Sequence, residues 1–448
     1  MSKPIELTDL LESVVGQVEM GELYEVRSDE LPVTFSAGEL ESIRSVQTAG
    51  RALRVIHQGR LGFSTTTDLA DESTLVQNAL ASAQFGDPVA FEFPAQPSPS
   101  AVQCFDAEVE RMDEEQLIAL GRAAADRLRA HDPDLQIEVS LVKRIDRVHL
   151  ANTNGLDRAY ASTSLSLWVE AIQTRGDDIL ILGRHAAARR RPDIDGPALA
   201  EHVIERLRWC ERTAQVRSGV MPVIFRSEAT LALLLPLLLG LNGRNVYLGT
   251  SPLGDRLGWV AFDSRLTLTD DGRADYGVRS APIDDEGVPT ETKEMVGAGQ
   301  VRRFLYDLRT AAQVGAEPTG NGFKSSGLFG GGYQEQPGVA PTNWSLAPGE
   351  SSLEQILAGL EEALLVEGLI GMGQGNILAG EFSNNVGVGF LVRRGEVVGR
   401  VKNTMIAGNV YELLRDNLLA LSDQREQVFG MITAPAMAID AVSVVGAG

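Results

Sequence analysis

The chain has 448 residues, of which 40 are Lys or Arg and 61 are Asp or Glu, giving a net charge of −21. So negative a chain is not attracted unspecifically to nucleic acid, because the phosphates repel it. The length of the chain predicts two or three domains. Two cysteines far apart, Cys104 and Cys210, exclude a disulfide framework and a CxxC site. Because the start also lacks a secretory apolar segment, we expect a cytoplasmic protein.

The first part of the chain predicts a mixed sheet covered by helices. Apolar residues at helical spacing predict a helix within residues 6–20, and alternating segments between glycine turns predict strands over residues 23–69. Further helices are expected over residues 71–85 and 112–133, separated by a proline-rich connector. Three more strands are expected at residues 135–142, 146–155 and 161–173.

Residues 183–197 include three consecutive arginines and predict an exposed connection. Such a run is usually a solvated loop, but on so acidic a protein it could equally dock an acidic partner surface. A helix over residues 196–216 is expected next, and GVMPVIF at residues 219–225 predicts a short buried strand.

The most apolar stretch, residues 225–243, predicts a buried central helix. A membrane span is not expected, because Leu231 to Leu241 is shorter than the roughly 20 residues that a bilayer requires. Pro236 also interrupts the run.

The same stretch has the outline of a zinc-peptidase helix, in which two histidines hold the metal and a glutamate activates water. Glu228 is present, but Ser227 precedes it, and the next turn supplies no usual zinc ligand. No histidine or cysteine follows Cys210 in the chain.

The second part of the chain is rich in glycine and β-branched residues and predicts a β-rich domain. The glycine run at residues 327–332 does not match a nucleotide-binding loop, because its lysine and serine precede the run. A helix capped by Ser351 and Glu354 is expected to reach Leu364, and a last helix is expected over residues 410–423.

Together these segments predict the α+β class. We expect an N-terminal mixed α/β domain over residues 1–215. A β-rich C-terminal domain with the central apolar helix is expected over residues 216–448.

Five segments, taken in order, resemble the TldD/PmbA family. They are GRALRVIHQGRLGFSTTTDL, TGNG at residues 319–322, PTNWSLAPGESSLEQIL, GLIGMGQGNILAGEFSNNVGVGFLV and RRGEVVGRVKNTMIAGN. The resemblance implies an N-terminal α/β domain, a β-rich C-terminal domain and cytoplasmic peptidase subunits that form dimers. It also implies that TldD-type members bind zinc through a helix motif HExxxH and a later cysteine.

Laid on this sequence, the histidines of that motif fall on Ser227 and Ala232, its glutamate falls on Glu228, and the later cysteine has no counterpart. One carboxylate from that helix would hold zinc far too weakly. The chain therefore resembles the PmbA (TldE) branch, which lacks the metal site. The resemblance implies no cofactor in this chain, zinc in a TldD-type partner, and a heterodimer that cleaves unfolded or extended peptides in a chamber.

Our primary hypothesis is thus a metal-free partner subunit without catalytic activity of its own. We expect Glu228, Asn321, Ser383 and Asn384 to face the chamber, although each could equally be a structural turn or capping group. Glycine-rich strands such as residues 380–389 let a peptide backbone approach closely and pair as an added strand.

Two other functions stay open. The chain could be a metal-independent hydrolase that uses Ser227 or Glu228, but a serine nucleophile needs a basic partner and no histidine follows His202. It could also be a non-catalytic homodimer that binds peptides or regulates another protein. Neither nucleic acid nor a membrane is expected as a partner.

Overall fold

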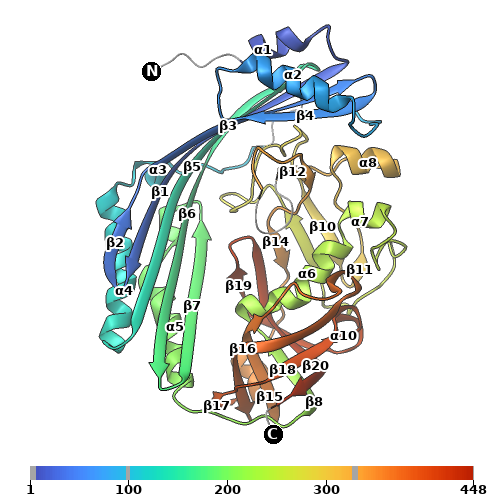
Figure 1. Ribbon diagram of the computed structural model, residues 1–448. Coiled ribbons are helices and arrows are strands. Elements are labelled where there is room, and N and C mark those ends of the chain that lie inside the picture. Colours follow the sequence, from blue (N-terminus) through green and yellow to red (C-terminus); the bar gives the residue numbers. More distant parts are fainter. Residues whose placement is uncertain (1–6, 97–100, 325–330, 447–448) are drawn as a thin grey trace.

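The computed structural model describes residues 7–96, 101–324 and 331–446, and it confirms the predicted α+β class. A sheet of long, arched strands forms the N-terminal region, and a β-rich C-terminal region lies against the concave side of the arch (Figure 1). The predicted division at residues 215 and 216 falls on the link between these two regions. Their independence as two domains stays a prediction.

The N-terminal sheet is antiparallel, and its edge strand β7 faces the C-terminal region. Among the described residues the strand order is β4-β3-β1-β5-β6-β7, with β2 paired to β1. The strands are β1 (Met20–Ser36), β2 (Glu39–Ile43), β3 (Val46–His57), β4 (Arg60–Thr66), β5 (Gln136–Asn152), β6 (Asp157–Arg175) and β7 (Asp178–Ala188).

The first two of the three strands predicted between residues 135 and 173 are one strand, β5. The polar residues between them were read as a break. Instead, Arg144 lies on the sheet, where it pairs with Asp146 of its own strand and with Glu30 of β1. A strand can run through charged residues when their ion-pair partners lie on the neighbouring strand.

Helices cover one face of this sheet, because Leu23 of β1 shares a core with α2 and Val33, ten residues further along the same strand, shares a core with α4. Helix α2 contacts β3 and β4, while α4 and α5 pack together on the convex side. Their starts follow capping rules, because the side chains of Asp71, Asp113 and Asp195 each accept a backbone N–H of the first turn. The helices are α1 (Leu7–Val14), α2 (Glu72–Ala83), α3 (Ala107–Arg111), α4 (Glu114–His131) and α5 (Gly196–Trp209), with a 3-10 turn η1 (Arg191–Asp193) before α5.

The prediction of an exposed connection over residues 183–197 is wrong for its first half. Strand β7 continues to Ala188, and Arg184 and Arg189 are only 8% and 6% exposed. The Arg189 guanidinium donates to five backbone carbonyls, among them those of Gly277 and Ser280 of the C-terminal region. Arg189, the first residue of the arginine run, is therefore part of the contact between the two regions.

The C-terminal region is built on a closed barrel. Strands β20, β18, β16, β15 and β8 pair in that order, and β8 pairs back to β20. The strands of its sheet are β8 (Gly219–Phe225), β9 (Leu268–Asp271), β10 (Thr292–Gly297), β11 (Gln300–Val301), β14 (Trp344–Leu346), β15 (Glu362–Ile370), β16 (Glu381–Arg393), β17 (Glu396–Arg400), β18 (Met405–Asn409), β19 (Leu418–Val428) and β20 (Ile432–Val445); β12 (Gly322–Phe323) pairs with β13 (Gly338–Val339).

The predicted central apolar helix is confirmed as α6 (Leu231–Gly240). Its leucines Leu233, Leu234 and Leu237 are fully buried and share one core with residues of the barrel strands. No helix in the described part of the chain is long and apolar enough to cross a membrane. The other helical segments here are η2 (Ser227–Thr230), α7 (Gly243–Tyr247), α8 (Leu308–Val314), α9 (Leu353–Ala358), η3 (Ile377–Ala379) and α10 (Val410–Asp416).

Two predicted helices of this region are too long. Helix α9 ends at Ala358 and Leu364 belongs to β15; its capping box is made by Ser352 and Gln355, one residue later than predicted. Helix α10 ends at Asp416, and the apolar residues that follow form β19. Most of the glycine run at residues 327–332 lies outside the described residues.

Candidate functional site

The candidate site lies at the turn between β8 and α6, where the zinc-helix outline was found. Ser227 has a φ of 53°, which is uncommon for a residue other than glycine. Its side chain fixes this turn, because Oγ donates to Glu426 Oε2 at 2.7 Å and accepts from Arg184 Nη1 at 2.9 Å. The turn therefore joins three segments that are far apart in the sequence.

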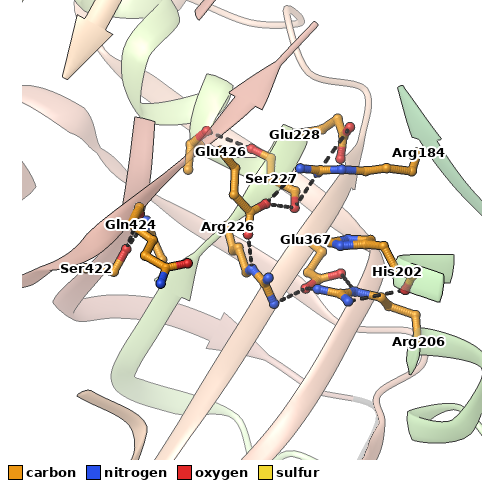
Figure 2. Close-up of polar contacts among 12 residues, drawn as sticks. Arg184, His202, Arg206, Arg226, Ser227, Glu228, Glu367, Ser422, Gln424 and Glu426 are labelled. Carbon is orange, nitrogen blue, oxygen red and sulfur yellow. Dashed lines mark hydrogen bonds and ion pairs between the residues drawn. The ribbon is translucent and has the colours of Figure 1, made fainter. Parts of the chain in front are cut away.

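Arg184 supplies the positive charge at this turn. It reaches from the edge strand β7 and donates through Nη2 to Glu426 Oε2 at 3.1 Å. Its Nη1 also lies 4.0 Å from Glu228 Oε1. Figure 2 shows its guanidinium beside Ser227, Glu228 and Glu426.

A second row of ion pairs continues from Glu426 toward helix α5 (Figure 2). Arg226 Nε donates to Glu426 Oε1 at 2.6 Å, and its Nη1 donates to Glu367 Oε1 at 3.2 Å. Arg206 then binds both oxygens of Glu367, at 2.8 and 2.9 Å. Because each buried charge has an opposite partner, the cost of removing the charges from water is offset.

Burial and the neighbouring charges determine the protonation states of the titratable groups at this turn. Burial by itself raises the pKa of Glu426, but Arg226 and Arg184 outweigh it and lower that pKa to about 2. Burial, followed by the charges of Arg206 and Arg184, lowers the pKa of His202 to about 2. Burial raises the pKa of Glu228, while Arg184 opposes that rise. At neutral pH, Glu426 is thus ionised and His202 is neutral.

A cavity of about 230 Å³ adjoins the turn. Its walls are mainly apolar, and its polar lining includes the side chains of the ion-pair rows. The lining includes Trp168, Gly183, His202, Glu228, Met372 and Phe429.

The residues present at this turn do not fit a zinc ion. Tetrahedral zinc is held by imidazoles, thiolates and carboxylates, whereas here a serine and an alanine occupy the expected histidine positions, Ser227 and Ala232. The guanidinium of Arg184 already lies against the nearby carboxylates and repels a second cation. Over the described ranges, no group of three or more His, Cys, Asp or Glu side chains is placed to hold a metal ion.

Ser227 also lacks the features of a serine nucleophile. Its side chain donates to Glu426, whose low pKa makes that carboxylate a weak base. The residue is only 2% exposed. The arrangement is therefore suited to fixing a turn and a cavity wall.

The structure separates the four residues expected at the chamber. Glu228 lines the cavity, whereas the other three do not. Asn321 is fully buried and donates to Asp270 and to the carbonyl of Ala340. Ser383 is exposed on β16, and its neighbour Asn384 is buried and donates to the carbonyl of Ile370. Their role at a chamber face stays a prediction.

Sequence reasoning missed the other members of the ion-pair network. Arg184, Glu367 and Glu426 lie on three different strands, and no spacing rule connects such distant positions. One signal was present: Glu367 interrupts the apolar run of β15 between Ala363 and Ile370, and a charge in such a run requires a buried partner.

Three family models match successive parts of the chain. They are PmbA/TldA metallopeptidase domain 1 at residues 21–83, the PmbA/TldA metallopeptidase central domain at residues 107–211, and the PmbA/TldA metallopeptidase C-terminal domain at residues 218–446. The last model alone covers more than half of the chain.

Known proteins match over most or part of the chain. Metalloprotease PmbA of Escherichia coli O157:H7 is 27% identical over 420 residues, which cover 91% of this chain and 88% of that protein. A metalloprotease TldD homolog of Buchnera aphidicola subsp. Schizaphis graminum is 28% identical over 193 residues, 43% of this chain and 38% of that protein. The crystal structure of TldE from Thermococcus kodakarensis has the same fold, with a TM-score of 0.89 at 21% identity over 98% of this chain and 100% of that chain.

Proposed function

Since this chain belongs to the PmbA/TldD family of metallopeptidases, we propose that it is the metal-free subunit of a two-chain peptidase. A TldD-type subunit carries the zinc and performs the hydrolysis. This chain forms part of the chamber wall and holds the substrate, an unfolded or extended peptide.

One observation supports the proposal: the guanidinium of Arg184 contacts Ser227, the residue at the first histidine position of the family's motif. Arg184 contacts Ser227 and Glu426 and lies 4.0 Å from Glu228, so the local carboxylates are already paired with a cation. A zinc ion would have to displace this arginine and would find no imidazole from the helix. The residues that fail to fit zinc thus form a stable ion-pair network.

The remaining assignments follow from this role. Glu228 faces the cavity, and the exposed Ser383 is a second candidate for the chamber face. The cytoplasm is the proposed compartment, because Cys104 and Cys210 are both free thiols. The proposed partner is a family member that retains HExxxH.

The test is reconstitution with such a family member from the same genome. We expect that neither this chain alone nor a partner whose motif glutamate is changed to glutamine cleaves an unfolded peptide substrate. The wild-type pair should cleave it and lose activity with a zinc chelator. Cleavage by this chain alone that survives the chelator would overturn the proposal.

Native mass of the same samples separates the homodimer alternative. A complex of unlike chains supports the proposal. A homodimer that ignores the partner and leaves its activity unchanged favours a separate binding or regulatory protein.

A further inference from the structure

The outer edge of β7 carries a hydrogen-bond pattern that resembles a paired strand. Strand β7 pairs only with β6 within the described sheet, so its other side is an edge. On that side the N–H of Ala187 donates to Gln427 Oε1 at 2.8 Å, and Gln427 Nε2 donates to the Ala187 carbonyl at 2.8 Å. One side-chain amide thus makes both bonds that a residue of an antiparallel neighbour would make.

The same edge continues toward the candidate site. The N–H and C=O of one strand residue point to the same side, and this side alternates along the strand. Because those of Ala187 point outward, the main-chain groups of His185 and Gly183 point outward as well. Further along, Ile179 and Ile181 are 61% and 52% exposed, so apolar surface accompanies this edge.

Three cavities follow one another along the strand and its end. The cavity of about 230 Å³ at the ion-pair network is lined by Leu182 and Gly183. A cavity of about 560 Å³ is lined by residues 186–188 and by Gln427. A third, of about 230 Å³, is lined by Arg189. Space beside the edge is therefore available on both sides of the Gln427 contact.

Gln427 is held in place by its own strand. It lies on β19 next to Glu426, the carboxylate that Arg184 and Arg226 bind. The ion pairs of Glu426 with Arg184 and Arg226 thus hold β19 close enough to β7 for the side chain of Gln427 to reach the main chain of β7.

We propose that the outer edge of β7 accepts an extended peptide as an added strand, and that Gln427 occupies the place of the peptide main chain until the peptide displaces it. The partner chemistry is that of an unfolded peptide with free main-chain amides. Its side chains alternate between the cavity at Gly183 and the face of Ile179 and Ile181. This inference rests on the proposed function, because it places the substrate of the pair on this subunit.

The competing explanation is that Gln427 only protects an exposed edge from aggregation. Native sheets commonly cover their edges in this way. The two explanations differ in what happens when the side chain is removed: a protective cap leaves no stronger peptide site behind.

The experiment measures binding of a fluorescein-labelled decapeptide of alternating threonine and alanine to the full chain by fluorescence anisotropy. In Gln427→Ala the peptide no longer has to break the two bonds of the glutamine, so its Kd is expected to fall about tenfold. Gln424→Ala is the matched control, because Gln424 is an exposed glutamine on the same strand. Its Kd should equal that of the wild type.

A second peptide tests the geometry. Methylation of alternate main-chain nitrogens removes the donors of an added strand, so this peptide should bind neither the wild type nor Gln427→Ala. An unchanged Kd in Gln427→Ala, or equal binding of the methylated peptide, would overturn the proposal.

Reconstitution separates this inference from the proposed function. If the pair cleaves peptides while Gln427→Ala binds no tighter, only the edge site is refuted. If Gln427→Ala binds tighter but the pair is inactive, the edge site stands and the proposed function fails.

Discussion

Two clusters of buried charge join the N-terminal sheet to the C-terminal region, and they differ in how completely they are closed. In the Arg54 cluster, Arg54 lies 2.7 Å from both Glu22 and Glu286, and the three side chains are at most 3% exposed. In the Arg184 cluster, the side chains of Glu228 and Glu426 are 19% and 21% exposed beside a cavity. Similar ion pairs thus serve as a closed structural joint in one place and as the wall of an accessible site in the other.

The largest effect is expected in the closed cluster. Arg54→Met leaves Glu22 and Glu286 buried without their cation, so the free energy of unfolding should fall by about 3–5 kcal/mol. Urea unfolding measures this change. A loss below about 1 kcal/mol would show that water reaches the two carboxylates, contrary to the closed joint described here.

A smaller effect is expected in the open cluster. Arg184→Met removes one cation from Glu426, but Arg226 and Ser227 still donate to that carboxylate. The free energy of unfolding should fall by about 1–2 kcal/mol, the cost of the lost charge-assisted bonds. A loss as large as that of Arg54→Met would erase the distinction between the two clusters.

The open cluster should also respond to pH through His202. Its pKa in the folded chain is lowered to about 2, whereas an unfolded histidine titrates near pH 6.5. Between these values the unfolded chain binds the additional proton, so stability is lost as the pH falls below about 6.5.

His202→Gln removes this contribution. The pH dependence of the unfolding free energy between about pH 4 and 6 should become flatter than in the wild type, by up to about 1.4 kcal/mol per pH unit. Urea unfolding at several pH values measures both slopes. Parallel slopes would mean that His202 is protonated in the folded chain.

The smallest effect is expected at an ion pair on the surface, whose two side chains are much more exposed than those of either cluster. Arg394 and Glu361 are 82% and 85% exposed. Arg394→Ala should therefore change the free energy of unfolding by less than about 0.5 kcal/mol. This variant is the baseline for the two cluster variants. A change in its free energy of unfolding above about 1 kcal/mol would contradict the low value expected for an exposed pair.

The sequence predicted most local structure but not how far strands extend. The strand at residues 219–225 and the core role of the following leucines were read correctly, because continuous apolar runs have few alternatives. Only its last three residues, 223–225, are buried, and Val220 is 70% exposed. Strand β5 was divided at its charged residues, and Arg189 after β7 was read as solvated. In both cases partners on other segments help to hold the charge: Glu30 binds Arg144, and backbone carbonyls of the C-terminal region bind Arg189.

The candidate site was predictable only in part. Ser227, Glu228 and Ala232 came from a motif within one helix. Arg184 was placed in an exposed loop, and Gln427 carried no signal, because their contacts cross between strands 240 or more residues apart. Local patterns therefore located the turn, while its electrostatic character required the fold.

The central claim is that an arginine, and not a metal, neutralises the carboxylates at this turn. Equilibrium dialysis of the purified chain against zinc, followed by elemental analysis, tests it most directly. We predict far less than one zinc ion per chain, in the wild type and in Glu228→Gln alike. One zinc ion per chain that is lost in Glu228→Gln would contradict the account.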